Sequence, residues 1–476
     1  MYENKNFIQG ENRHFALGLE GGSRALFLLT FSVFFSTILS IIFSAQFVFI
    51  FLLLLYMLFV IFLFKIPGIL ILLYVASFSN LFFSDTVSIL TYFYNLVFGF
   101  IIIIAFLRHG ISTTYINFLE DHYKAAGLLI LFSVFALISM LNNSRFTIRA
   151  VLETIRYFSL PILFLLWCSY LNKFYHIKRA LKYVLIFSVI VAIYSYFLLF
   201  KIGLSQFLLI GITSFHGVRT FFGNANSLAM NIGYSLPIVL SFIIYKKPTS
   251  YKWFAGLLFV FLIIIWLLCN SRSSYVFMFS AIIFLLFFLK KKTRYYLALV
   301  VALFCGWVMA DYLPLFRDLL RLESGLSLRD DLWSAAANMI KERPIFGFGP
   351  ASYDEIKFAF LGPSAGRSLA GTSFGGAAHN LYLTKAAEIG IFGLFTLLAF
   401  FFFIFYKFFS NFRYLKNSEW LYIYIGSGAV IFGLLFRSFF EIGNLIGNGR
   451  LGENIITFVF ISLIFKLPLI INNDFR

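Results

Sequence analysis

Residues 253–289 read WFAGLLFVFLIIIWLLCNSRSSYVFMFSAIIFLLFFL. Two apolar runs make up almost all of this stretch, and only the short polar segment from Asn270 to Ser274 separates them. A helix needs about 20 apolar residues to cross the hydrocarbon of a bilayer, and each run comes close to that length. Because backbone groups in lipid must satisfy their hydrogen bonds within the segment, we interpret both runs as helices. The stretch therefore predicts two membrane-crossing helices joined by a short polar turn.

The rest of the chain follows the same pattern of long apolar runs. Of its 476 residues, 61% are hydrophobic and only 12% are charged, which is too little charge to cover the surface of a soluble protein. We therefore predict an all-α, polytopic membrane protein with about fourteen transmembrane helices and both ends in the cytoplasm. The runs of spanning length lie near residues 25–43, 47–64, 66–83, 87–107, 124–142, 151–171, 180–200, 225–245, 253–270, 273–289, 295–313, 380–406, 420–440 and 454–471.

The basic residues distinguish the two sides of this membrane protein. Lysine-rich clusters fall on the cytoplasmic side, as the positive-inside rule requires, at residues 173–182, 246–252, 290–294 and 407–416. The net charge of +18 is spread over such short loops, so it indicates membrane topology and contact with anionic lipid, and not nucleic acid. The outer side is rich in arginine instead. A guanidinium fits phosphate oxygens bidentately, although pairing with nearby carboxylates is the alternative explanation.

The order of the apolar runs predicts four parts of the chain. The third part contains one outer loop, residues 314–379, that is much longer than the other connections. The four parts are a cytoplasmic tail at 1–24, N-terminal transmembrane helices at 25–209, a core at 210–409 that includes the long loop, and C-terminal transmembrane helices at 410–476.

The long outer loop has an internal pattern of its own. Apolar residues recur at helical spacing within it, and Pro344 ends the pattern, which predicts an amphipathic helix. The glycine-rich residues 361–378 that follow are typical of a flexible flap over a site. The apolar positions of the predicted helix are Leu328, Leu332, Ala335, Ala336 and Met339.

Four polar motifs follow one another on the outer side. The chain has Arg219, Gly223, Asn224 and Asn226 before one helix, then Ser271-Arg272 between two helices, then the stretch 343–349, and finally His379-Asn380. In this order, over about residues 210–400, the motifs resemble those of the O-antigen ligase and polymerase family of bacterial membrane glycosyltransferases.

This resemblance implies transfer of a glycan from an undecaprenyl-diphosphate carrier to an acceptor hydroxyl, on the periplasmic or exterior face of the inner membrane. The acceptor would be a second lipid-linked glycan in a polymerase, or lipid A-core in a ligase, and the sequence does not separate the two. The resemblance also implies that Arg219 and Arg272 hold the diphosphate, that His379 activates the acceptor, and that no metal or other cofactor is needed.

The residue types suit that chemistry. A departing diphosphate develops negative charge that must be stabilised, and arginines can do this without Mg²⁺. Histidine suits general base catalysis because its ordinary pKa lies near neutrality. We expect inversion at the anomeric carbon, with His379 removing the acceptor proton, and we expect Asn380 to contact the substrate. The outer acidic pair that comes nearest to a metal-binding cluster, Asp330-Asp331, lies in the amphipathic stretch, which argues against metal binding there.

Several of these positions have a structural alternative. Asn224 and Asn226 either contact the substrate or cap the helix that follows them. Arg437 and Glu441 are expected to form a buried ion pair, with a role in substrate binding as the alternative. Arginines near the fifth predicted helix could extend the anion site or pair with carboxylates; they are Arg145, Arg149 and Arg156.

A membrane transporter of a small solute is the alternative function. A transporter would need ionisable residues in the middle of helices, or paired broken helices in two repeated halves. Neither feature is visible in the sequence, and the placement of the motif arginines on the outer side argues against a pathway through the membrane.

Overall fold

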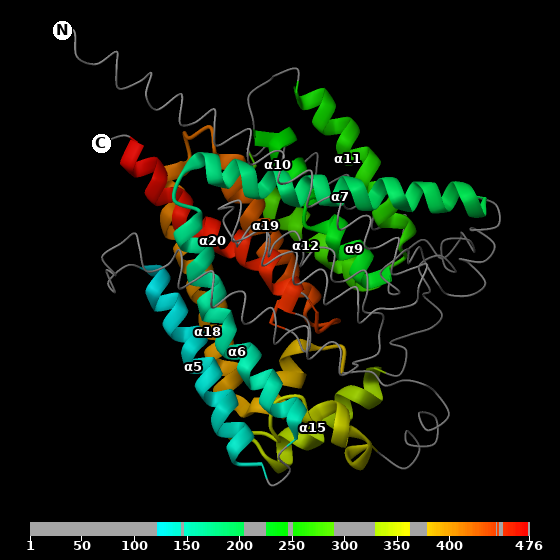
Figure 1. The fold of residues 1–476 in the computed structure, drawn as a ribbon, viewed down its shortest axis with the longest axis vertical. Helices are drawn as coiled ribbons and strands as arrows, with labels where there is room; N and C mark the ends of the chain where they lie inside the picture. Colours follow the sequence, from blue (N-terminus) through cyan, green and yellow to red (C-terminus); the bar gives the residue numbers. More distant parts are fainter. Residues whose placement is uncertain are drawn as a thin grey trace, which may run out of the picture. The chain divides into compact units, whose positions relative to one another are not determined.

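In a computed structural model of the chain, the described residues are 121–143, 147–203, 225–245, 251–289, 329–361, 378–443, 445–446 and 451–474. All of them belong to one compact unit, residues 73–476. Every regular element in this part of the chain is an α-helix or a short 3-10 helix (Figure 1), which confirms the all-α prediction. The helices predicted before residue 121 and near 295–313 lie outside the described residues, as do Arg145, Arg219 and Asn224.

Seven stretches of the described chain are long and apolar enough to cross a membrane. Two shorter apolar helices, α12 (Arg272–Phe287) and α19 (Leu421–Arg437), accompany them. All nine coincide with predicted runs, and the total of about fourteen stays a prediction. The seven are α5 (Asp121–Leu141), α6 (Ile148–Tyr170), α7 (Phe174–Ile202), the broken pair α9 (Ala225–Gly233) and α10 (Leu236–Tyr245), α11 (Tyr251–Leu268), α18 (Leu381–Leu415) and α20 (Leu451–Asp474).

The apolar helices pack closely where glycines replace larger side chains. α12 lies along α19, and a Cβ at Gly433 of α19 would come within 2.7 Å of the carbonyl oxygen of Phe277 on α12. Small residues of this kind let helix backbones approach each other in a membrane. Large apolar side chains elsewhere point outward, for example Phe200 (89% exposed) and Trp253 (84% exposed), as expected of a surface in contact with lipid.

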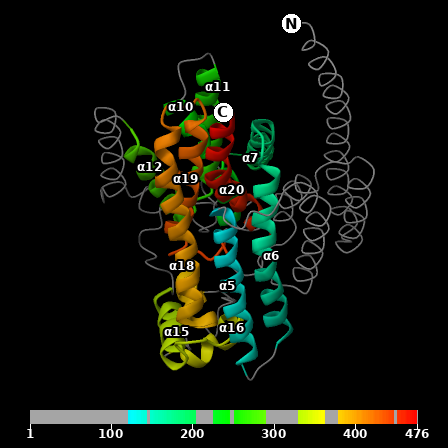
Figure 2. The same ribbon diagram turned by 90° about the vertical axis from the view of Figure 1, so that its left-hand side faces the viewer.

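The described part of the long loop, which excludes most of the flap predicted at 361–378, forms a small helical layer against the first turns of α18 (Figure 2). It contains α15 (Arg329–Glu342), α16 (Ser352–Ile356) and the 3-10 helix η3 (Lys357–Phe360). α15 confirms the predicted amphipathic helix, and it ends before Pro344 as expected. Its buried face packs against Tyr353, whose hydroxyl donates to the carbonyl oxygen of Leu332 at 2.7 Å. The buried residues of that face are Leu332, Ala335, Ala336 and Met339.

A kink in α18 provides the attachment point for this layer. Gly390 has φ 80° and ψ −179°, which interrupts the helix and leaves backbone groups on both sides of the kink without helical partners. The stretch 343–349 supplies those partners: the amides of Phe348 and Gly349 donate to the carbonyls of Ala387 (3.0 Å) and Glu388 (2.8 Å). The motif at 343–349 therefore fastens the outer loop to the helix that follows His379.

Candidate active site

His379 lies two residues before the start of α18, and the residue between them caps the helix. Asn380 is the N-cap, and its side-chain oxygen accepts from the amide of Leu383 at 3.0 Å. His379 itself has φ 49°, in the left-handed region that non-glycine residues rarely adopt. Two further contacts hold this turn: the amide of Leu381 donates to the carbonyl of Ser438 (2.8 Å), and Trp333 Nε1 donates to the carbonyl of Ala378 (2.8 Å).

The side chain of His379 faces a carboxylate. Its Nδ1 lies 3.3 Å from Oε1 of Glu441, which follows α19, and the two side chains are 28% and 14% exposed. Burial raises the pKa of Glu441, but the charge and hydrogen bond of His379, the charge of Arg437 and the amide of Ile442 outweigh that effect and lower the pKa below its ordinary range. Glu441 is therefore an anion at neutral pH, and it fixes the orientation of the imidazole ring.

Two other sequence motifs meet at the same carboxylate. Nδ2 of Asn226 donates to Oε2 of Glu441 at 2.8 Å, and the hydroxyl of Ser271 donates to Oδ1 of Asn226 at 2.6 Å. Ser271 is also the N-cap of α12, which begins at Arg272. Asn226 lies within the first turn of α9, so its side chain links the site and does not cap the helix. The first turns of α9, α12 and α18 thus converge on Glu441.

Arginine charge gathers beside this group of polar residues. Arg272 is the first residue of α12, and Arg329, the first residue of α15, lies close enough for its charge to act on that of Arg272. Helix N-termini favour anions, and two guanidinium groups that repel each other gain from a shared anion. The motifs found in the sequence do not include Arg329. The signal that could have identified it is its position at the start of the predicted amphipathic helix.

The remaining predicted residues fall in different surroundings. The side chain of Arg149 is 46% exposed, and its Nη1 lies 4.0 Å from Oε1 of Glu355. Of the two alternatives for this arginine, the structure therefore favours pairing with a carboxylate. Arg437 is buried, as predicted, and its charge acts on Glu441, while its Nη1 donates to the carbonyl of Gly443 at 3.2 Å. Within the described residues, no group of three or more histidine, cysteine or acidic side chains could hold a metal ion.

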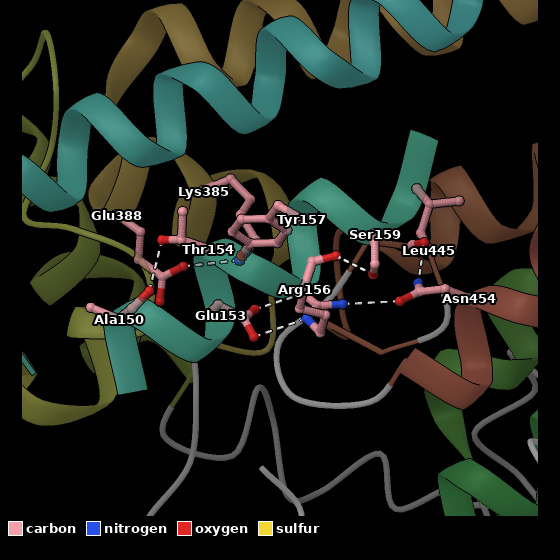
Figure 3. Close-up of polar contacts among 10 residues, drawn as sticks. All are labelled: Ala150, Glu153, Thr154, Arg156, Tyr157, Ser159, Lys385, Glu388, Leu445 and Asn454. Atoms are coloured by element: carbon pink, nitrogen blue, oxygen red, sulfur yellow. Dashed lines mark hydrogen bonds and ion pairs between the residues drawn. The ribbon is translucent and has the colours of Figure 1, made fainter. Parts of the chain in front are cut away.

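A second polar cluster is buried between α6, α18 and α20 (Figure 3). Arg156 binds Glu153 bidentately, with Nε 2.9 Å from Oε2 and Nη2 2.6 Å from Oε1. On α18, Lys385 donates to Glu388 at 2.9 Å and also to the hydroxyl of Tyr157. Arg156 therefore takes the paired alternative and does not extend an anion site. The balanced charges suit a buried location, because an unpaired charge there would be costly.

The helices and the two polar clusters define an all-helical membrane protein with a polar site assembled where several helices begin. Residues 257–398, from α11 to the middle of α18, match the family model described as O-antigen ligase. The predicted resemblance to the O-antigen ligase and polymerase family is confirmed over these residues. A search of the curated proteins found no relative that matches the chain. The match supports glycan transfer of the O-antigen ligase type in general terms, and the apolar helices indicate a membrane protein.

Proposed function

We propose that the protein transfers a glycan from undecaprenyl diphosphate to an acceptor hydroxyl, at the outer face of the bacterial inner membrane. The observation that carries this proposal is the pairing of His379 with Glu441 at 3.3 Å, next to the first turns of α9 and α12. A histidine held by a carboxylate is the arrangement that general base catalysis needs. The core at 210–409 would supply the substrate site, and the flap at 361–378 would cover it.

The pairing determines which nitrogen of His379 does the chemistry. A carboxylate only accepts hydrogen bonds, so Nδ1 carries the proton that faces Glu441, and Nε2 keeps its lone pair for the acceptor hydroxyl. As the acceptor oxygen bonds to the anomeric carbon, its proton moves to Nε2 and the bond from that carbon to the diphosphate breaks. This single displacement inverts the configuration. Glu441 then stabilises the imidazolium, and base catalysis of this kind contributes about 10²–10⁴ in rate.

Arginines would stabilise the departing diphosphate. Arg272 and Arg329 bring two guanidinium groups together from α12 and α15. Arg219, in the segment before α9, is proposed as a third from its place in the sequence motif. Charge that develops on the leaving group in a water-poor site is stabilised most by donors already in position. No step in this scheme calls for a metal ion, so we expect transfer to continue at the same rate when a chelator is added.

The direct test is transfer by the purified protein. An undecaprenyl-diphosphate-linked oligosaccharide would be supplied as donor, first with a second lipid-linked glycan and then with lipid A-core as acceptor. We expect a lengthened glycan and released undecaprenyl diphosphate, at the same rate with and without a chelator, and an inverted linkage by NMR. The acceptor that works separates a polymerase from a ligase. Absence of transfer to either, together with solute uptake by proteoliposomes, would favour a transporter instead.

A further inference from the structure

The segment that carries Glu441 is held in place from the neighbouring helix α20. After Glu441 the chain reaches Leu445, whose carbonyl oxygen accepts from Nδ2 of Asn454 at 2.6 Å. Oδ1 of the same amide accepts from Nη1 of Arg156, on α6, at 2.9 Å. Asn454 is only 1% exposed, so both ends of its amide are committed inside the protein.

Arg156 is in turn fixed by Glu153. All three guanidinium nitrogens are engaged: two bind the carboxylate of Glu153, and the third binds Asn454. Both members of the ion pair are almost fully buried, with side chains 1% and 2% exposed. A planar guanidinium held by three hydrogen bonds has little freedom to rotate, so it restrains the position of the Asn454 side chain.

The same turn of α6 also reaches the helix that carries His379. Tyr157, the residue after Arg156, accepts a hydrogen bond from Lys385, six positions after His379 in the chain. The guanidinium carbon of Arg156 lies 4.8 Å from the centre of the Tyr157 ring, and Lys385 Nζ lies 5.1 Å from it. Adjacent residues of α6 therefore contact the supports of both members of the His379–Glu441 pair, as Figure 3 shows for the contacts of Arg156, Tyr157 and Asn454.

We infer that Arg156 and Asn454 are positioning residues, which set the place of Glu441 relative to His379 from a distance. This inference rests on the proposed function of that pair. Neither residue needs to contact the substrate: Asn454 restrains the backbone at Leu445, and Arg156 restrains Asn454. Loss of the link should loosen Glu441 without changing the surface that binds the donor.

The substitution Asn454→Asp tests the link. A carboxylate still accepts from Arg156, but it has no hydrogen to donate to the carbonyl of Leu445. We expect kcat to fall about tenfold to a hundredfold, with KM for the lipid-linked donor unchanged, because a small misplacement of a catalytic group has effects of that size. The matched control is Ser462→Ala, which removes another α20–α6 contact, the 3.5 Å bond to the carbonyl of Phe164, about two turns further along α20 than Asn454. Its kcat should stay at the wild-type value.

A double-mutant cycle distinguishes positioning from general stabilisation. In a Glu441→Gln background, Asn454→Asp should reduce kcat no further, because its effect passes through the Glu441 carboxylate. Equal effects of Asn454→Asp in both backgrounds, or a kcat loss matched by Ser462→Ala, would overturn the inference. Full activity of Glu441→Gln alone would instead refute the proposed function. If Asn454→Asp does not fold, Arg156→Lys can replace it. One ammonium group cannot form the three directed hydrogen bonds of the guanidinium, so this substitution breaks the same link. Arg156→Lys would be tested alone and in the Glu441→Gln background, and the expected results are the same.

Discussion

At the scale of single residues, His379 combines an unusual backbone conformation with the chemical role proposed for it. Its φ of 49° places it in the left-handed region, which costs of order 1–3 kcal/mol for a residue other than glycine. The Asn380 cap and the bond from Leu381 to Ser438 hold the turn in that conformation. Strain that surrounding contacts maintain is typical of functional sites, and here it aims the imidazole at Glu441.

This strain predicts a separation of stability from activity. Glycine adopts the left-handed region freely, so His379→Gly should remove the strain while it removes the base. We expect a melting temperature equal to or above that of His379→Ala, together with loss of transfer in both variants. Thermal unfolding of the purified proteins would measure the difference. A clearly lower melting temperature for His379→Gly would show that the turn is not strained.

Arg329 offers a second prediction at this scale. If it helps Arg272 to stabilise the diphosphate, Arg329→Gln should lower kcat/KM by about tenfold to a hundredfold, the loss expected for one charged hydrogen bond of about 1.5–3 kcal/mol. Lys341→Gln is the matched control, because Lys341 is an exposed cation in the last turn of the same helix. Steady-state kinetics with the lipid-linked donor would compare them. Equal losses of kcat/KM in both variants would show that the effect comes from the overall positive charge of α15 and not from Arg329 itself.

Some of these residues were predictable from the sequence and others were not. Asn226, Arg272 and His379 stand out because polar residues are rare between apolar runs and because their order matches a family. The contact between Glu441 and His379 was not predicted, because the two residues lie 62 positions apart in the chain. The sequence indicated a pair with Arg437 instead, because Arg437 is a near neighbour of Glu441. Spacing along one helix does not reveal a contact that forms only when α18 and the end of α19 meet.

At the scale of elements, the kink at Gly390 connects the helical layer of the long loop to α18, the helix that follows His379. The amide of Ile391 donates to the carbonyl of Pro344 at 2.9 Å, beside the bonds that Phe348 and Gly349 form with α18. The amphipathic α15 was predictable from its periodicity. The kink was not, because one glycine within a long apolar run does not reveal a backbone angle.

The kink predicts that Gly390 tolerates no side chain. A Cβ there would lie 2.0 Å from the carbonyl oxygen of Ile345, and φ is 80°. Gly390→Ala should therefore lower the melting temperature and detach the stretch 343–349, with greater proteolysis of the outer loop. Gly127→Ala is the control, since nothing lies within 4 Å of that Cβ in α5, and alanine favours a helix by about 1 kcal/mol. Similar melting temperatures for the two variants would argue against a fixed kink.

At the scale of the whole molecule, composition alone predicted the class of protein. The apolar runs gave helices whose ends match the structure within a few residues in most cases, because backbone in lipid has few alternatives to helix. The break between α9 and α10 was not predicted, since the apolar run continues through it. Which side of the membrane each end faces rests on the distribution of lysine and arginine.

That sidedness can be tested by labelling. In a cysteine-free background, Lys341→Cys and Lys178→Cys would be exposed to a membrane-impermeant maleimide in spheroplasts. Both lysines are exposed in the folded protein, so reactivity reports the side of the membrane. We expect Lys341→Cys to react in intact spheroplasts and Lys178→Cys to react only after permeabilisation. The reverse pattern would invert the topology and move the candidate site to the cytoplasm.

The most direct measurement of the central claim is the rate of glycan transfer by purified wild-type protein, His379→Ala and His176→Ala. His176 is the matched control, because it lies on α7 and bonds to Asn172 at 2.9 Å, apart from the candidate site. Release of undecaprenyl diphosphate would report the rate. We predict equal rates for wild type and His176→Ala, and a loss of about 10²–10⁴ in His379→Ala. Undiminished transfer by His379→Ala would contradict the account.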